Sequence, residues 1–452
     1  MRDLALLGFL GALIAFGFRR PFLFALAYIY VDTVSPHRLS YYLLNSIPLS
    51  MIVAALAFAG WLIADARKGF GVSPRQGLMA LLLAYTAWTT SHADFPVEAL
   101  EKWDWVWKAV AFAIFLPLTL RTRLRIEACV LFLVLSAASI VIVGGIKTMM
   151  SGGGYGVLNL MVDNNSGLYE GSTISTIAIG IVPLILWLAR FGTIFAPDWR
   201  VKLFAGGLIF ACLLMPIGTE ARTGLVCIAV LAMLMLRDVK RRFLYLAGAA
   251  LVATAAIPFL PASFTSRMAT IQGYEADQSA STRIAVWRWT WDYAIENPAG
   301  GGFGAYRQNR IMVQTRDSRM VGDVELVTPR FEPDEGRAYH SAFFEMLGEQ
   351  GFAGLILFLL IHGIGLARME IVRRRYRGAG DGAEWISPLA TALQHFQIIY
   401  LAGSVFVGIA YQPFVWLVLG AQIGFDRWVS RRFRAPRRPP MRPEPAIPVP
   451  AG

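Results

Sequence analysis

The stretch GRAYHSAFFEMLGEQGFAGLILFLL, residues 336–360, joins a polar start to a long apolar run. Arg337 and His340 stand just before a segment long enough to cross, as a helix, the roughly 30 Å of a bilayer core. Similar runs recur along the 452 residues, which are 56% hydrophobic and 16% charged, with a mean hydropathy of +0.52. Because membrane β-strands instead alternate over about ten residues, these continuous runs predict an all-α, polytopic inner-membrane bundle.

About 12–13 spans are expected. The first segment is followed by Arg19 and Arg20, where a cleavage site would need small residues, so we expect a retained span and not a signal peptide. If the first two short segments form one re-entrant unit, the count is twelve, with both ends inside the cell. The expected spans are residues 4–18, 21–35, 47–64, 77–91, 103–120, 126–146, 172–190, 203–219, 222–236, 243–261, 340–367, 386–405 and 409–426.

Basic residues in the connections predict the topology, because loops rich in Lys and Arg stay in the cytoplasm. The rich connections are Arg19–Arg20, residues 65–75, 121–125, 190–202, 237–242 and 368–377, and the tail from Arg427. Residues 262–339 lie one span away from a rich connection on either side. This long loop is therefore expected on the periplasmic side.

Four regions follow from these boundaries. We expect transmembrane helices over 1–261, a periplasmic loop with amphipathic helices over 262–339, C-terminal transmembrane helices over 340–426, and a disordered, basic, Pro-rich cytoplasmic tail over 427–452. The loop contains nine Arg, no Lys and ten Asp or Glu. Since arginine suits bidentate binding of phosphate and carboxylate, the loop is a candidate anion-binding region.

The net charge of +12 does not indicate a nucleic-acid partner, because the basic residues lie beside membrane segments. The three cysteines fall in or beside apolar runs without metal-ligand spacing. Buried free cysteines commonly serve as small hydrophobic residues. No histidine pair or carboxylate cluster has metal-ligand spacing either. We expect no metal and no cofactor.

Arg222, in GTEARTGLVCIAV, begins a span at its expected outer end. It can reach the lipid headgroups from there, or be neutralised by Glu220. The third interpretation is an anion site beside the long loop.

Arg283 and Arg288 lie in STRIAVWRWTWDYAIENPAGGGFGAY. Residues 281–295 predict an amphipathic helix on the outer leaflet surface, capped by Ser281 or Thr282 and ended by Asn297-Pro298. Its apolar face would be Trp287, Trp291 and Ile295. Each arginine is either a solvated or headgroup residue, or a phosphate ligand.

His340 is the one histidine that both follows an arginine closely and begins a span. An imidazole of near-neutral pKa suits a general base, although a lone histidine is at least as often a packed structural residue. Arg337 can add an anion contact. Asp163, Asn164 and Asn165, at the outer mouth of another span, can hydrogen-bond a polar ligand or simply form a turn.

Arg222 and His340 thus belong to span boundaries, and Arg283 to the long loop, all expected on one side of the membrane. Arginines and one histidine, without metal, suit a pyrophosphate-bearing lipid donor. The arginines would offset charge on the leaving group, and the histidine would deprotonate an incoming hydroxyl.

These residues resemble the hallmarks of the O-antigen ligase superfamily of bacterial inner-membrane proteins, which includes O-antigen polymerases and protein O-oligosaccharyltransferases. The stretches that carry the resemblance are TEARTGLV (219–226), STRIAVW through NPAGGGFGAY (281–306) and YHSAFFEMLGEQGFAGLILFLL (339–360). The N-terminal residues 2–40 are similar to the branch called exosortase A-associated O-glycosylation ligases.

The resemblance implies a metal-independent, inverting glycosyltransferase with an undecaprenyl-pyrophosphate-linked donor and a lipid or protein acceptor. It assigns Arg222 and Arg283 to the pyrophosphate, with Arg288 as a substitute for Arg283, and His340 to the base. Two alternatives stay open. A polymerase of the same superfamily would use a second lipid-linked glycan as acceptor, and a polysaccharide transporter or flippase would carry ionisable residues deep in its spans.

Overall fold

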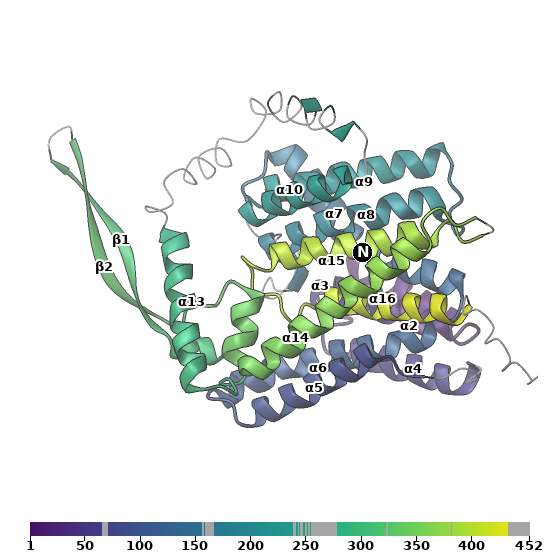
Figure 1. The fold of residues 1–452 in the computed structure, drawn as a ribbon, viewed down its shortest axis with the longest axis horizontal. Helices are drawn as coiled ribbons and strands as arrows, with labels where there is room; N and C mark the ends of the chain where they lie inside the picture. Colours follow the sequence, from purple (N-terminus) through teal and green to yellow (C-terminus); the bar gives the residue numbers. More distant parts are fainter. Residues whose placement is uncertain are drawn as a thin grey trace, which may run out of the picture.

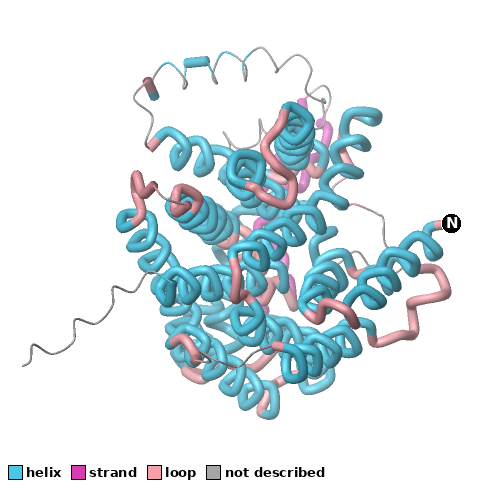
Figure 2. The backbone as a smooth tube through the Cα atoms, turned by 90° about the vertical axis from the view of Figure 1, so that its right-hand side faces the viewer, coloured by secondary structure: helices cyan, strands magenta, loops and turns pink. Residues whose placement is uncertain are grey.

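The computed structural model describes residues 1–65, 71–155, 158, 167–237, 241, 242, 244, 247, 248, 251, 254, 278–321, 324–380 and 382–432. Long helices pack side by side into a bundle, seen from the side in Figure 1 and towards the helix ends in Figure 2. The bundle helices are α1 (Arg2–Gly17), α2 (Phe22–Val34), α4 (Leu49–Ala64), α5 (Pro74–Ser91), α6 (Pro96–Thr119), α7 (Arg123–Ser151), α8 (Gly171–Phe191), α9 (Trp199–Gly218), α10 (Arg222–Leu236), α14 (Ala342–Arg375), α15 (Ile386–Gly403) and α16 (Pro413–Arg432). Short elements are α3 (Pro36–Leu39), η1 (Gly167–Tyr169) and η4 (Ala305–Gln308).

The all-α prediction is confirmed. Each expected span except 243–261 overlaps one of these helices, and that segment lies mostly outside the described residues. In the described part, four helices are long and apolar enough to cross a membrane: α7, α8, α9 and α14. The apolar helices α2, α4 and α10 are shorter. The number of spans and their orientation stay predictions.

Local signals explain several helix ends. Ser73 and Gln76 form a capping box at the start of α5, and Pro74 occupies its first position. Asp198 caps α9 through a 2.8 Å hydrogen bond from the amide of Val201. Gly152 ends α7 with φ 73°, a conformation that costs glycine little.

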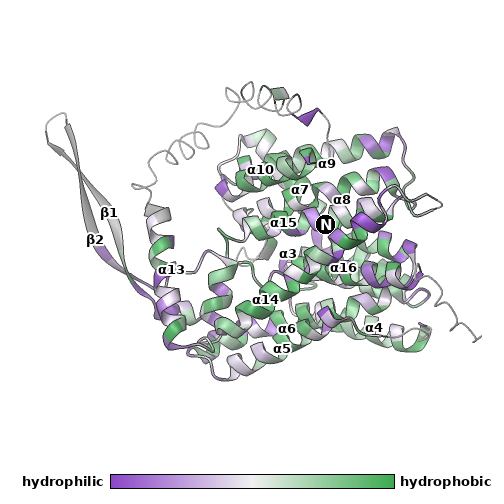
Figure 3. Cartoon of the chain, in the orientation of Figure 1, coloured by the Kyte–Doolittle hydropathy of each residue, from purple (hydrophilic) through white to green (hydrophobic). Residues whose placement is uncertain are grey.

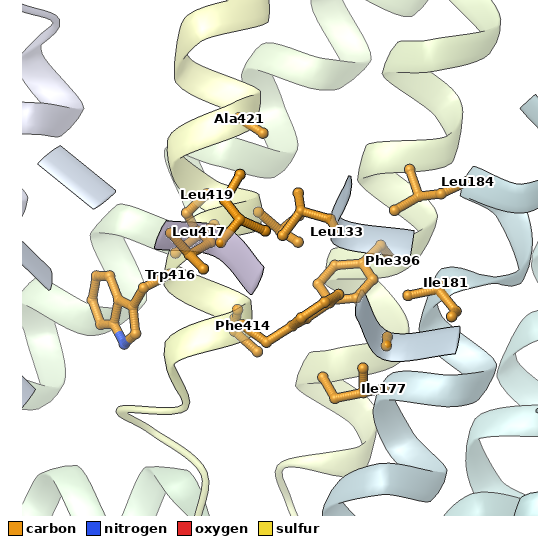
Figure 4. Close-up of a cluster of buried hydrophobic side chains, with 14 of the residues drawn as sticks. Leu133, Ile177, Ile181, Leu184, Phe396, Phe414, Trp416, Leu417, Leu419 and Ala421 are labelled. Atoms are coloured by element: carbon orange, nitrogen blue, oxygen red, sulfur yellow. The ribbon is translucent and has the colours of Figure 1, made fainter. Parts of the chain in front are cut away.

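The core lies around α8, which contacts α7, α9, α10 and α15. Its side chains are buried over most of its length. Figure 4 shows Ile177, Ile181 and Leu184 from α8 near Phe396 of α15, with Leu133 of α7 and Phe414 of α16 beside them. Colouring by hydropathy shows the bundle helices as largely apolar (Figure 3).

The loop between the spans contains α13 (Gln278–Glu296) and a two-stranded antiparallel sheet, β1 (Arg310–Val321) with β2 (Val324–Glu335). In Figure 1, α13 runs across one end of the bundle and the hairpin projects from it. The hairpin was not predicted, because we expected only helices in this loop. The sequence contained a signal for it: Gly322-Asp323 separates two runs with β-branched residues, as in two-residue hairpin turns.

One detail of the expected loop helix was wrong. The helix begins at Gln278, so neither Ser281 nor Thr282 is its cap. Val286, Thr290, Tyr293 and Ala294 are buried, whereas Trp291 and Ile295 are exposed. Protein therefore covers the predicted apolar face only in part, and the place of this face on the leaflet surface stays a prediction. The end of the helix before Asn297 is as predicted.

Candidate active site

Residues 336–341 connect β2 to α14 and hold His340 beside α13. The indole Nε1 of Trp287, on α13, donates a 2.8 Å hydrogen bond to the carbonyl oxygen of Tyr339. The same ring stacks on Phe344, with centroids 5.0 Å apart. These two contacts on either side of His340 fix its position relative to α13.

His340 has a backbone conformation that side chains rarely adopt. Its φ is 47°, and Glu220, two residues before α10, has φ 52°. In the described part of the chain, Ser35 is the third non-glycine residue with positive φ. Each such residue costs about 1–3 kcal/mol and is held only by surrounding structure. One of the three is thus His340 itself, and another lies two residues before Arg222.

The charges around His340 come from three different segments. Its ring keeps an exposed surface, yet crowding by protein atoms lowers the pKa of His340 below the usual value of 6.5. The positive charge of Arg283 lowers this pKa further, the carboxylate of Glu170 opposes that effect, and Arg337 adds a smaller lowering. A lowered pKa favours the neutral imidazole at neutral pH, which is the form that accepts a proton.

Glu170 joins the N-terminus of α8 to this group. Its carboxylate caps the helix by accepting hydrogen bonds of 3.0 and 2.6 Å from the amides of Ser172 and Thr173. The same carboxylate acts electrostatically on His340. Sequence analysis missed this residue, although a Glu before Gly-Ser-Thr at the start of an apolar run is typical of a helix N-terminus.

Arg222 lies on the other flank of α8. It is the first residue of α10, as predicted. Ser175 of α8 shares a 2.9 Å hydrogen bond with Thr219, three residues before Arg222. Gly224 packs so closely on Ser175 and Pro216 that a Cβ there would lie 3.0 Å or less from their atoms. The first turns of α8 and α10 are therefore in direct contact.

The two arginines of α13 differ in their surroundings. Arg283 is half-buried and acts on His340, whereas Arg288 is exposed. Five residues of α-helix correspond to a rotation of about 140°, so the two side chains leave α13 on different faces. Of the pair, Arg283 is the one placed with His340.

Arg337 already has a protein partner. Its guanidinium forms an ion pair with Asp334 of β2. Its backbone is held by Asn309, which is fully buried: the Asn309 side chain accepts from the Arg337 amide at 2.9 Å and donates to the Arg337 carbonyl at 2.6 Å. The backbone contacts of Arg337 therefore hold the segment before His340, and its positive charge is partly neutralised by Asp334. Asp163, Asn164 and Asn165 lie outside the described residues.

A further group of charges was not predicted. Lys102 of α6 bonds to Glu345 and Glu349, which are both buried in the first turns of α14. These carboxylates lie in an apolar stretch of the sequence. An acidic residue inside a span is rare and commonly has a partner in the bundle, so their positions could have indicated this group.

The arrangement combines one histidine with Arg283 and with the turn that carries Arg222, near the N-terminus of α8. Arginines favour anions, and a neutral imidazole accepts a proton. This chemistry suits transfer of a group away from a phosphate leaving group. Searched over the described residues, the chain holds no group of three or more His, Cys, Asp or Glu side chains with metal-site geometry.

An apolar cavity of about 360 Å³ lies elsewhere, between α7, α8 and α9. It is lined by Glu127 and Arg200 near the start of α7 and α9, whereas Glu170 stands at the start of α8 and Arg222 at the start of α10. Because α7 and α9 end near the site rather than begin there, this cavity is not part of it.

Comparison with known families divides the chain in two. Residues 207–359 match the family described as O-antigen ligase, and residues 1–193 match a family of unknown function, DUF5935. No curated protein matches the chain. The first match covers every proposed site residue from Arg222 to His340, and it confirms the resemblance to the O-antigen ligase superfamily, a family of glycosyl-transferring membrane enzymes. The exosortase-associated branch stays a prediction.

Proposed function

We propose that this chain, whose residues 207–359 match the O-antigen ligase family, is an inner-membrane glycan ligase. It would transfer an oligo- or polysaccharide from undecaprenyl pyrophosphate to a hydroxyl of a lipid or protein acceptor on the periplasmic face. The observation that carries the proposal is the placement of His340 with Arg283 and with Glu170, which caps the N-terminus of α8.

In the proposed reaction, His340 takes the proton of the acceptor hydroxyl as its oxygen attacks the anomeric carbon of the glycan. The bond from that carbon to the pyrophosphate oxygen breaks, and its electron pair leaves with the undecaprenyl pyrophosphate. Attack opposite the leaving group inverts the anomeric centre. His340 afterwards releases its proton to water.

Arg283 and Arg222 would stabilise the negative charge that grows on the leaving pyrophosphate. Their positions support this role, because one lies on α13 beside His340 and the other begins α10 beside α8. Pyrophosphate at the ends of apolar helices leaves the polyprenyl chain in the bilayer. This is our explanation of why a membrane segment begins with a histidine.

The test is transfer by purified protein in EDTA, with an undecaprenyl-pyrophosphate glycan and candidate lipid and protein acceptors. We expect wild-type transfer, a loss of about 10²–10⁴-fold in His340→Ala, as is usual when a general base is removed, and a comparable loss in Arg222→Ala and Arg283→Ala. Arg374→Ala, which removes an exposed arginine at the far end of α14, is the control. Near wild-type activity of His340→Ala would refute the base assignment.

The products separate the alternatives. A single glycan on a new acceptor indicates ligation, whereas a ladder of lengthened lipid-linked glycans indicates a polymerase. If neither product forms with any acceptor, while reconstituted protein moves lipid-linked glycan across vesicles, the transporter alternative replaces the ligase.

A further inference from the structure

The helix that follows His340 is broken after its first nine residues. Within α14, Gly351 has φ 61° and ψ −165°, which are not helical values. Residues 342–350 therefore form a short section that is separate from the long section after the break. A Cβ at Gly351 would lie 2.1 Å from the carbonyl oxygen of Pro298, so the break also needs glycine. Because the helix is interrupted, the long section cannot by itself orient the short one.

The backbone of the glycine turn after α13 contacts the short section directly. The amides of Gly301 and Gly302 donate to the carbonyl oxygens of Gly348 and Glu349 at 3.1 and 2.9 Å. Beyond the break, the amide of Phe352 donates to Pro298 at 3.1 Å. The turn thus occupies the place of the missing helical hydrogen bonds and joins the section to α13.

A partly buried lysine provides the side-chain anchor. Lys102 Nζ lies 2.7 Å from Glu345 Oε1 and 2.7 Å from Glu349 Oε2. The second oxygen of Glu345 accepts from the amide of Ala410 at 2.9 Å, and Glu349 accepts from the amide of Gly304 at 3.2 Å. One lysine of α6 therefore ties the short section to α6, while the two carboxylates tie it to two loops.

The charges make Lys102 indispensable to this arrangement. Glu345 and Glu349 are four residues apart, on one face of the section, and their side chains are only 9% and 1% exposed. Two buried carboxylates repel each other without a cation between them. The rings of Phe303 and Tyr411 face the ammonium with centroids at 4.9 and 5.7 Å, which adds attraction specific to a cation.

The near end of the same section leads directly to His340. The amide of Ala342 donates to the carbonyl oxygen of Ser404 at 2.8 Å, and Ser341 is buried. A rotation of the section would move these residues and, through them, the strained backbone of His340.

We propose that Lys102 is a positioning residue for His340, acting through Glu345 and Glu349 on the orientation of residues 342–350. The inference rests on the proposed function for the role of His340, but the orientation itself can be measured without any assay of transfer.

The principal variant is Lys102→Met, which keeps a long, unbranched side chain and removes its charge. Lys108→Met is the matched control, because Lys108 lies on the same helix and pairs with exposed Asp104 at 2.8 Å, away from α14. Lys102→Arg keeps the charge and should retain more activity than Lys102→Met. If Lys102→Met does not fold, Glu349→Gln replaces it, since Glu345 then keeps its lysine.

The first measurement is amide hydrogen exchange of peptides covering residues 337–350 in purified protein. We expect Lys102→Met to speed exchange in these peptides at least tenfold over wild type, and Lys108→Met to leave it unchanged. If exchange is unchanged in both Lys102→Met and Glu349→Gln, the inference is wrong. This result does not depend on the transfer assay, so it stands even where the proposed function fails.

The second measurement is steady-state transfer. A misplaced base lowers kcat at least tenfold, while KM for the donor changes less than threefold, because Arg222 and Arg283 lie outside the short section. Wild-type kcat despite faster exchange overturns the inference. A second outcome also overturns it: the kcat of Lys102→Met falls only in proportion to the fraction of folded protein, and Lys102→Arg loses as much kcat as Lys102→Met. Lys102 would then be a purely structural residue.

Discussion

His340 is placed by strain as well as by contacts. With φ 47°, its backbone adopts a conformation that glycine accepts readily and other residues do not. Hydrogen bonding at Tyr339 and burial of Ser341 hold the two neighbours, so the histidine between them cannot relax. Strained residues of this kind are concentrated at functional sites, where a fixed orientation is worth its energetic cost.

Replacing His340 should therefore separate stability from function. We expect His340→Gly and His340→Ala to be equally inactive, and the glycine variant to be more stable by about 1 kcal/mol, because alanine keeps the left-handed strain. Thermal unfolding of the two proteins in the same detergent measures the difference. A glycine variant less stable than the alanine variant would show that the backbone at this position is not strained.

The charges facing His340 predict opposite shifts of the pH profile. If the neutral imidazole is the base, transfer falls as pH drops through the pKa of His340. Glu170 raises that pKa, so Glu170→Gln should move the acid limb to lower pH. Arg337 lowers it, so Arg337→Gln should move the limb to higher pH. Profiles of kcat/KM for both variants provide the measurement, and shifts of the same sign would contradict His340 as the titrating group.

At the scale of helices, the sequence predicted those features that depend on a single local pattern. Apolar length alone located the expected spans, and Arg222 at the start of α10 followed from its place before an apolar run. The sequence did not predict contacts between segments that lie far apart along the chain. The pairing of Lys102 with Glu345 joins residues 243 positions apart, and the buried network of Arg75, Gln422 and Gln397 joins α5, α16 and α15. The apolar periodicity of one helix does not indicate which residue of another helix pairs with it.

Burial of Arg75 and His362 also qualifies one argument from the sequence. A transporter would carry ionisable residues deep in its spans, whereas most charges of this sequence are expected at or between span boundaries. Arg75 is 2% exposed in the first turn of α5, and His362, inside α14, hydrogen-bonds Gln397 at 2.9 Å. Of these two, His362 lies within an expected span and Arg75 lies at a span boundary, so the transport measurement described above keeps its purpose.

The break in α14 gives a prediction at the same scale. Gly351→Ala should destabilise the protein by about 2–4 kcal/mol, because the added Cβ meets Pro298 and the backbone conformation is unfavourable for alanine. Gly363→Ala is the control in the same helix: no atom lies within 4 Å of its added Cβ, and a change within about 1 kcal/mol is expected. Equal unfolding temperatures would mean that the break is not needed for the fold.

For the whole molecule, the orientation in the membrane connects the site to its donor. The structure places α13 and the hairpin at one end of the bundle and the basic end of α16, with Arg431 and Arg432, at the other (Figure 1). Since basic ends stay in the cytoplasm, His340 should face the periplasm. The site then lies at the periplasmic leaflet, where the glycan of the polyprenyl donor is exposed.

Cysteine labelling tests this orientation directly, because the endogenous Cys129, Cys212 and Cys227 are all buried and give little background. Glu335→Cys places a thiol on β2, where the side chain is 66% exposed, and Arg374→Cys places one at the far end of α14, where it is 75% exposed. Both changes remove surface ion pairs, which contribute at most about 1 kcal/mol. In sealed, right-side-out vesicles, a membrane-impermeant maleimide should label Glu335→Cys at once and Arg374→Cys only after permeabilisation. The reverse pattern would put His340 in the cytoplasm, where a donor with its glycan on the periplasmic leaflet cannot reach it, and the proposed ligase reaction would then be wrong whatever the geometry of the site.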